Sequence, residues 1–308
     1  MPSSTTADRR TCLITGANAG IGKAAAVLLA ADGWHVVLGC RSPERGAAAL
    51  REVRERSRSD AVELLELDLS LQASIRRAAA NWLAGHTRLD ALIHNAAAFD
   101  YAQRRRTRTA EGFETIWATN HLGPVLLTDL LLEALRRSDQ GRVLTVASKG
   151  LALFPGLRVD LDDPEFERRR WTVTRAYYQS KLAQVLYTRH LAERLAGSSI
   201  TANCVRVPNV RIDLRRYPGL SRLARLAYSI KSRFALSPET MARTYLRLAA
   251  SDELRGVTGR CFDEHGREVR MNRSSCDREH VERVMALTRS CLAARADASD
   301  ADARTGGP

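Results

Sequence analysis

Several patterns that mark particular protein classes are missing from this 308-residue sequence. Its six cysteines lie far apart and form no C-x-x-C pair, which argues against a zinc ribbon or a disulfide framework. No run reaches the roughly 18 apolar residues of a membrane span, because acidic residues and glycine interrupt the best candidates. The first ten residues lack the apolar core of a secretory signal. We therefore expect a cytoplasmic protein with no membrane association.

Lysine is almost absent, although the chain is strongly basic. Lysine and arginine together number 48 against 35 acidic residues, which gives a formal net charge of +13. The arginines are scattered over nearly every predicted helix, a pattern more typical of a GC-rich genome than of a nucleic-acid-binding surface. We expect no nucleic-acid partner and keep open an arginine-lined approach for anionic ligands.

The sequence does contain a regular alternation of short β-rich runs and longer helical ones. An apolar fraction of 44% supports a sizeable core. The strand candidates, short and rich in β-branched or apolar residues, are 11–15, 35–40, 62–68, 91–95, 142–148 and 200–207. The helical segments between them are 22–31, 44–56, 75–83, 111–135 and 176–195. Repeated β-then-α units predict an α/β fold with a parallel, doubly wound sheet.

Three segments depart from this alternation. Residues 1–10 are predicted to be flexible, and the small, polar residues 295–308 to be disordered, which leaves a single domain over 11–294. Residues 208–236 are rich in Arg, Leu and Tyr and follow the sixth strand. An insertion at this point of an open sheet lies over the ligand crevice, so we interpret it as a substrate lid. Ser237, followed by proline, is then the expected N-cap of a helix.

A glycine-rich loop follows the first strand. The sequence TGANAGIG places Gly16, Gly20 and Gly22 between that strand and a helix. Glycine allows backbone N–H groups to approach a pyrophosphate closely, and the helix N-terminus adds its partial positive charge. The loop therefore predicts a dinucleotide-binding site. The other residues of this loop that we expect to contact the cofactor are Asn18, Ala19 and Ile21.

The end of the second strand indicates which dinucleotide is bound. NAD-binding sites usually place a carboxylate there, which accepts a hydrogen bond from the ribose 2′-hydroxyl. Here the strand ends with Cys40 and Arg41, followed by Ser42. A guanidinium suits a 2′-phosphate, so we expect NADP(H) to be favoured over NAD(H). The alternative is that Arg41 is one more surface arginine.

Two tyrosines precede a lysine in the segment TRAYYQSK. Tyr177 lies four residues before Lys181 and Tyr178 lies three before it, so on a helix both phenols share a face with the ammonium. An ammonium about 4 Å from a phenol, at an effective dielectric of about 20, stabilises the phenolate by roughly 4 kcal/mol. Such a pair can act as a proton donor near neutral pH. Spacing does not choose between the tyrosines, and both rings could instead only pack at a helix interface.

These motifs occur together in one known family. The spacing T-G-x-x-x-G-x-G, HNAA after the fourth strand, NHLG, a serine ending the fifth strand and Y-x-x-x-K resemble the short-chain dehydrogenase/reductase family. The similarity covers about residues 11–294, and CRS, AYYQSKLA and the later SPE and GVTGRCF look most like its retinol-dehydrogenase-like branch. The resemblance implies a Rossmann-type fold and, as is usual in the family, a homodimer or homotetramer.

The resemblance also implies roles for individual residues. Tyr177 would be the general acid or base, and Lys181 would bind the nicotinamide ribose and assist the tyrosine. Ser148 would orient the carbonyl, and Asn120 would support a water-linked proton relay. Asp68 resembles an acid that contacts adenine, with a cap of the following helix as its alternative role. The other positions implied near the cofactor are Leu69, Asn95, Ala96, Ala97, Pro208 and Val210.

Some polar residues near these motifs also have structural interpretations. Asn95 either forms part of the loop beneath the adenine ribose or has a purely structural role. His94 and His121 flank motif residues but have no partners at metal-ligand spacing, so we expect packed or hydrogen-bonded histidines. No metal site is predicted.

Three places depart from the family pattern. Ala97 stands where relatives commonly have glycine, and the loop after the sixth strand has Val207-Pro208 where they usually show Pro-Gly. Ile212 replaces a threonine whose hydroxyl would bond the cofactor carboxamide, so backbone groups must orient the ring or the cofactor is held less well. The basic run 103–109 either faces an anionic substrate or is a solvated loop.

Together these features predict an NADPH-dependent oxidoreductase that reduces a hydrophobic ketone or aldehyde to an alcohol, or catalyses the reverse. Its partner would be a small hydrophobic carbonyl or alcohol substrate, with the apolar residues of 208–236 as a wall of the pocket. The first alternative is another reaction class on the same fold, such as a cyclase, dehydratase or epimerase. The second is a non-catalytic nucleotide-sensing regulator.

Overall fold

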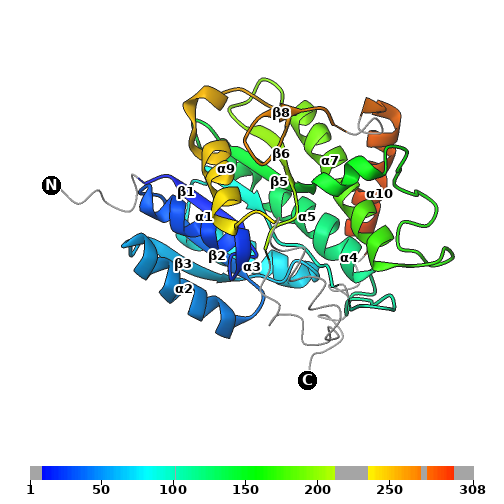
Figure 1. Ribbon diagram of the computed structural model, residues 1–308, viewed down its shortest axis with the longest axis horizontal. Coiled ribbons are helices and arrows are strands. Elements are labelled where there is room, and N and C mark those ends of the chain that lie inside the picture. The colour runs from blue at the N-terminus through cyan, green and yellow to red at the C-terminus, as the bar shows by residue number, and fades with distance from the viewer. Residues whose placement is uncertain (1–8, 101, 212–234, 272–275, 295–308) are drawn as a thin grey trace.

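One eight-stranded sheet forms the centre of the molecule in the computed structural model, which describes residues 9–100, 102–211, 235–271 and 276–294 (Figure 1). The strand order is β3-β2-β1-β4-β5-β6-β7-β8; all neighbouring pairs are parallel except β7 and β8. The strands are β1 (Thr11–Thr15), β2 (His35–Cys40), β3 (Val62–Glu66), β4 (Ala91–His94), β5 (Arg142–Ser148), β6 (Thr201–Val207), β7 (Cys261–Phe262) and β8 (Glu268–Val269). The order changes direction between β1 and β4, so ligands are expected at the carboxyl ends of these strands.

Helices cover both faces of the sheet (Figure 1). One face packs against α1 (Gly20–Ala31), α2 (Pro43–Ser57) and α9 (Pro238–Ala250). The other face packs against α3 (Gln72–Gly85), α5 (Gly123–Leu130) and α7 (Val173–Arg194), with α10 (Arg278–Ala293) packed on α7. In the described part of the chain, no helix is long and apolar enough to cross a membrane.

The central strands supply side chains to both layers of the core. In β1, Cys12 and Ile14 belong to the cluster with α1 and α9, whereas Leu13 belongs to the cluster with α3 and α5. All three are fully buried. Strands buried on both faces read as continuous apolar runs, which is why such short segments could be recognised in the sequence. The fold is the predicted doubly wound Rossmann-type sheet.

The predicted helix 111–135 is confirmed only in part, because it begins later than expected and is interrupted. Gly112 has a φ of 82°, and helical structure begins only after it. Pro124 has no N–H to complete an α-helical bond to the carbonyl of Asn120, and the chain forms a π-helical turn at this point. A further break follows at Leu131, where ψ is 6°. The segment therefore consists of α4 (Thr115–Trp117), η2 (Ala118–Leu122), α5 and α6 (Leu132–Arg136).

Two short 3₁₀ helices complete the described structure, η3 (Lys149–Leu153) and η5 (Asp252–Leu254). The expected helix start at Ser237 is confirmed, because its hydroxyl accepts a hydrogen bond from the N–H of Thr240 at 3.1 Å.

The predicted lid, 208–236, is described only at its two ends, and residues 1–8 and 295–308 also lie outside the described residues. Val210 forms a parallel bridge with Leu236. The carbonyl of Asn209 accepts from the N–H of Leu236 at 3.0 Å, and the carbonyl of Leu236 accepts from the N–H of Arg211 at 2.9 Å. Both ends of the segment thus lie together just beyond the carboxyl end of β6, and its function as a lid stays a prediction.

Candidate active site

The glycine-rich loop joins β1 to α1 at the point where the strand order changes direction. Gly16 and Gly20 have φ values of 67° and 57°, which favour glycine. A Cβ atom on Gly16 would lie 2.9 Å from Cα of Ala96, whereas the space beside Gly20 is open. A Cβ atom on Gly22 would lie 2.4 Å from Nδ2 of Asn95. Gly16 and Gly22 therefore permit close packing, and Gly20 leaves room beside the loop.

The N-terminus of α1 is suited to an anion. Its N-cap residue is Ala19, which has no side-chain acceptor, and its first turn contains no acidic residue. By contrast, α2 is capped by Ser42 and α7 by Thr172. The first N–H groups of a helix have no intrahelical partners and carry partial positive charge. The loop with Asn18 and Ile21 and this uncapped helix end together fit a pyrophosphate group.

Asn95 connects three elements next to the loop. Its Nδ2 donates to the carbonyl of Thr15 at 3.0 Å and to that of Gly16 at 3.4 Å. Its Oδ1 accepts from the hydroxyl of Tyr245 in α9 at 3.4 Å. The backbone N–H of Ala96 donates to Oγ1 of Thr15 at 3.0 Å. These bonds give Asn95 a structural role, and its place beneath the adenine ribose stays a prediction.

The end of β2 lacks a carboxylate. Cys40 is buried, and burial raises the pKa of its thiol to about 11. Arg41 is exposed, and none of the described acidic side chains forms an ion pair with it. The hydroxyl of Ser42 caps α2, accepting from the N–H of Arg45 at 3.3 Å and donating to Oε2 of Glu44 at 2.8 Å. Arg41 is thus an exposed cation, directly after β2, that is available to bind a phosphate group of the cofactor.

The end of β3 leads into a turn that is ordered by Asp68. Its Oδ1 accepts from the N–H of Ser70 at 2.9 Å and from the hydroxyl of the same residue at 2.7 Å. The cap of α3 comes instead from Glu111, whose carboxylate accepts from the first two amides of that helix at 2.9 and 3.1 Å. Asp68 therefore closes the turn and does not cap the helix. Leu69, beside it, is buried.

The two tyrosines of the YY pair have different surroundings. The ring centre of Tyr177 lies 4.5 Å from that of Phe99, which follows β4. The ring centre of Tyr178 lies 4.8 Å from that of Phe154. A Cβ atom on Gly150 would lie 2.2 Å from Oη of Tyr178, so this phenol occupies the space that a side chain there would need. Tyr178 therefore packs on η3, directly after β5.

Lys181 lies one helical turn after Tyr177 and is 2% exposed. Its ammonium donates to the backbone carbonyl of Val146 in β5 at 2.7 Å and lies 5.8 Å from the centre of the Tyr177 ring. Burial lowers the pKa of Lys181 to about 8. The site thus holds a buried cation that is still largely protonated at pH 7.

Ser148 and Asn120 lie on two other elements, β5 and η2. Ser148 ends β5, and its hydroxyl accepts from the N–H of Gly150 at 3.2 Å. Asn120 lies in η2, where its Oδ1 accepts from the N–H of Ala98 at 2.6 Å. Its Nδ2 donates to the carbonyl of Ala98 at 3.2 Å and to Oγ of Ser180 at 3.0 Å. Asn120 therefore joins the loop after β4 to α7, at a position two residues after Tyr178.

The remaining sequence-predicted residues lie at the same edge of the sheet or outside the described residues. Ala97 is exposed in the loop after β4. Pro208 and Val210 are half-buried just after β6. Ile212, the replacement for the family threonine, lies outside the described residues, so the altered nicotinamide contact stays a prediction.

The basic run 103–109 forms surface ion pairs. Arg106 pairs with Glu167 at 2.8 Å, and its guanidinium also donates to the carbonyl of Glu165. Arg108 pairs with the same Glu167 carboxylate. These contacts favour the solvated-loop interpretation over an approach for an anionic substrate.

The two histidines near the motifs are buried and hydrogen-bonded, as expected. Nε2 of His94 lies 2.7 Å from the hydroxyl of Thr128, and Nε2 of His121 lies 2.7 Å from that of Thr288. Burial lowers the pKa of each imidazole to about 3. Both residues are therefore neutral at physiological pH.

Three aromatic contacts at the site were missed from the sequence: those of Phe99, Phe154 and Tyr245. Phe99 is the first large side chain after the HNAAA segment, at the carboxyl end of a central strand. The rule that ligands bind at this edge could have identified it. No local pattern places Tyr245, which reaches Asn95 from 150 residues along the chain.

Known proteins resemble this chain over most of its length. A model of the short chain dehydrogenase family matches residues 10–156. Human Retinol dehydrogenase 13 is 37% identical over 265 residues, which cover 85% of this chain and 78% of that protein. Human Retinol dehydrogenase 12 is 38% identical over 252 residues, 82% of this chain and 77% of that protein.

Solved structures share the fold. A crystal structure of a protein from Mycobacterium paratuberculosis has 33% identity and a TM-score of 0.68, and covers 94% of this chain and 97% of that one. A short chain dehydrogenase from Shigella flexneri, solved with NADP, has 23% identity and a TM-score of 0.64, and covers 83% of this chain and 96% of that one. With the identities to the human relatives, these matches place the chain in the short-chain dehydrogenase/reductase family, in its retinol-dehydrogenase-like branch.

Proposed function

We propose that this member of an oxidoreductase family uses NADP(H) to interconvert a hydrophobic ketone or aldehyde and its alcohol, with Tyr177 as the acid or base. The position of Tyr177 carries the proposal. Its ring contacts Phe99 and lies 5.8 Å from the ammonium of Lys181, on the helix that crosses β5. This is the edge of the sheet at which the glycine-rich loop begins.

Each residue of the site would contribute one physical effect. The phenol of Tyr177 gives a proton to the carbonyl oxygen in reduction and takes it back in oxidation. The ammonium of Lys181 stabilises negative charge on that phenol, more strongly than in water because it is buried. The hydroxyl of Ser148, at the end of β5, would hold the carbonyl oxygen. Asn120 holds the loop after β4 against α7 and so supports a proton path.

The cofactor would be held by the glycine-rich loop and the uncapped start of α1, which fit its pyrophosphate. When bound, the nicotinamide supplies or accepts the hydride. Arg41 supports NADP(H), because it is exposed, has no acidic partner among the described residues and follows a strand without a terminal carboxylate.

Exposed apolar side chains support a hydrophobic substrate. Leu153 is 77% exposed and Phe154 is 38% exposed, and both lie just after Ser148 in the chain. Phe154 also contacts Tyr178, which extends the apolar surface towards the tyrosine pair. Retinol, which appears in the names of the relatives, is itself a hydrophobic alcohol.

Three further features belong to the proposal. We propose that residues 208–236 cover the substrate, that the protein acts in the cytoplasm, and that it forms a homodimer or homotetramer. Each follows from sequence pattern or family resemblance.

The decisive experiment is to follow NADPH absorbance with a panel of ketones and aldehydes, and NADP⁺ reduction with the matching alcohols. We expect turnover with at least one hydrophobic pair and a lower KM for NADPH than for NADH. Tight NADPH binding without turnover of any substrate would contradict the proposal and favour another reaction class.

A further inference from the structure

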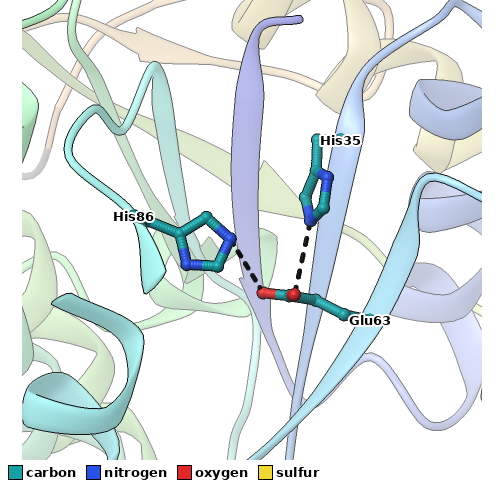
Figure 2. Close-up of side chains that lie close together, drawn as sticks. All are labelled: His35, Glu63 and His86. Atoms are coloured by element: carbon teal, nitrogen blue, oxygen red, sulfur yellow. Dashed lines mark ion pairs between the residues drawn. The ribbon is translucent and has the colours of Figure 1, made fainter. Parts of the chain in front are cut away.

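Three side chains with no part in the proposed function meet near the amino ends of two strands, away from the carboxyl ends where the proposed site lies (Figure 2). His35 is the first residue of β2, Glu63 is the second residue of the neighbouring strand β3, and His86 directly follows α3. These are the amino ends of the strands, whereas the glycine-rich loop follows the carboxyl end of β1. The cluster is therefore separate from the proposed catalytic site.

The distances in this cluster match those between ligands of one metal ion. Oε1 of Glu63 lies 3.2 Å from Nε2 of His86, and its Oε2 lies 3.5 Å from Nε2 of His35 (Figure 2). Ligand atoms of the three residues all lie within 4.8 Å of one another. Zinc binds nitrogen and oxygen at about 2.0–2.2 Å, so two ligands of a tetrahedral ion are about 3.4 Å apart. Small side-chain rotations would suffice to admit the ion.

The surroundings of His86 present its Nε2 as a lone-pair donor. Its Nδ1 lies 3.0 Å from the backbone carbonyl of Trp82, and a carbonyl only accepts hydrogen bonds, so the Nδ1 proton is placed there. The Trp82 ring stacks on the imidazole with centres 4.7 Å apart and planes within 10°. In the neutral form, Nε2 then directs its lone pair at the carboxylate of Glu63. A carbonyl that fixes the far ring nitrogen is a common arrangement for metal-binding histidine.

His35 adds a second, independent indication. Its Nε2 is buried and has no hydrogen-bond partner among the described residues, although Oε2 of Glu63 lies 3.5 Å away. Buried polar atoms without partners are uncommon in native structures, and a bound cation would satisfy this one. The Glu63 side chain is 37% exposed, so an ion can reach the cluster from solvent.

We propose that His35, Glu63 and His86 bind one divalent transition-metal cation, with zinc as the best fit and water completing the coordination. Two imidazoles and a carboxylate suit zinc, whereas magnesium and calcium prefer sites made of oxygen alone. The bound ion joins the starts of β2 and β3 to the end of α3. It stabilises this edge of the sheet and takes no part in the chemistry at Tyr177.

The test is a calorimetric titration of the full, untagged and metal-stripped chain with zinc chloride. We expect one zinc ion per chain, a higher Tm with zinc than without, and no displacement by excess magnesium. The variants His86→Gln and Glu63→Gln should each weaken zinc binding by about tenfold or more. Cobalt(II) should give the visible absorption of a tetrahedral site in the native protein and lose it in His86→Gln.

Two variants control for binding elsewhere. His190 also faces a carboxylate, that of Glu282 at 3.0 Å, but it belongs to no three-residue cluster in the described part of the chain. His190→Gln should therefore leave zinc affinity unchanged, as should Cys276→Ser, which removes an exposed thiol. Because Glu63→Gln preserves side-chain shape, it remains informative if a histidine variant fails to fold. Absence of stoichiometric zinc binding, or equal affinity in the native protein and both cluster variants, would overturn the proposal.

Discussion

The ammonium of Lys181 lies 5.8 Å from the centre of the Tyr177 ring while it donates a hydrogen bond to β5. This bond fixes the rotation of α7 on the sheet, because the lysine is buried against the carbonyl of Val146. Tyr178, one residue further along the helix, is consequently directed at Gly150. The tertiary contacts thus distinguish the two tyrosines that the helical spacing left equivalent, and Tyr177 is the proposed proton donor.

Replacing each tyrosine by phenylalanine separates these roles. Tyr177→Phe should lower kcat by about 10² or more, since it removes the proton-transferring group. Tyr178→Phe should have a mild effect, because its ring packs on Phe154 and η3 and the change keeps the ring. Steady-state kinetics with the best ketone or aldehyde gives both values. A larger loss in Tyr178→Phe than in Tyr177→Phe would reverse the assignment.

Lys181→Met should abolish activity and yet stabilise the fold. Burial lowers the pKa of the lysine from its ordinary 10.5 to about 8, so the folded state binds this proton less tightly than the unfolded state does. Below about pH 8 both states are protonated, and the native fold bears the full cost of burying the charge. Removing the ammonium should therefore raise the free energy of unfolding at pH 7, by up to about 3 kcal/mol.

The same linkage gives a pH signature. Between about pH 8 and 10.5 the unfolded native sequence binds more protons at this site than the folded one, so its stability rises with pH. Lys181→Met should lose that rise. Urea unfolding at several pH values measures both effects, and a variant that is less stable at pH 7 with unchanged pH dependence would contradict the expectation.

Arg41 is expected to determine cofactor preference. Arg41→Ala should weaken NADPH binding by about 10- to 100-fold and leave NADH binding nearly unchanged, because a charge-assisted hydrogen bond contributes about 1.5–3 kcal/mol. Arg51→Ala is the matched control, since Arg51 is also an exposed arginine but lies within α2. Fluorescence titrations with both cofactors measure the change. Equal losses for NADPH and NADH would show that Arg41 does not contact the 2′-phosphate.

The sequence predicted the sheet well because its strands are buried on both faces and read as short apolar runs. Three of the six predicted strands, β1, β2 and β5, have the expected bounds. The late start and the interruptions of the helix predicted over 111–135 were missed, because its apolar periodicity continues across Gly112 and the π-helical turn, which depend on local backbone geometry. Periodicity reports which face is buried but not whether the hydrogen-bond ladder is continuous.

The candidate site residues were singled out by their motifs, whereas the residues that they contact were not. Asn120 was singled out, but its contacts with Ala98 and Ser180 arise only when the loop after β4 meets α7. The cluster of His35, Glu63 and His86 was missed for the same reason. Its members are more than 20 residues apart in sequence. They meet only when β2 pairs with β3 and the end of α3 lies beside these strands.

The glycine-rich loop offers a matched pair of substitutions that separates folding from cofactor binding. Both Gly16 and Gly20 have positive φ, so alanine costs about 1–2 kcal/mol of backbone strain at either position. At Gly16 the new Cβ would also lie 2.9 Å from the backbone of Ala96, whereas at Gly20 it would meet only open space. Gly16→Ala should therefore destabilise the fold more than Gly20→Ala.

Cofactor binding should follow a different order from stability. In Gly20→Ala the added methyl group occupies the open space beside the start of α1, where the pyrophosphate is expected. NADPH affinity should therefore fall by about tenfold or more, while the fold loses only the backbone strain energy. Urea unfolding and NADPH titration on the same samples measure the two effects separately. If Gly20→Ala bound NADPH as tightly as the native protein, the pyrophosphate could not lie against this part of the loop, and the assignment of the dinucleotide site would have to move.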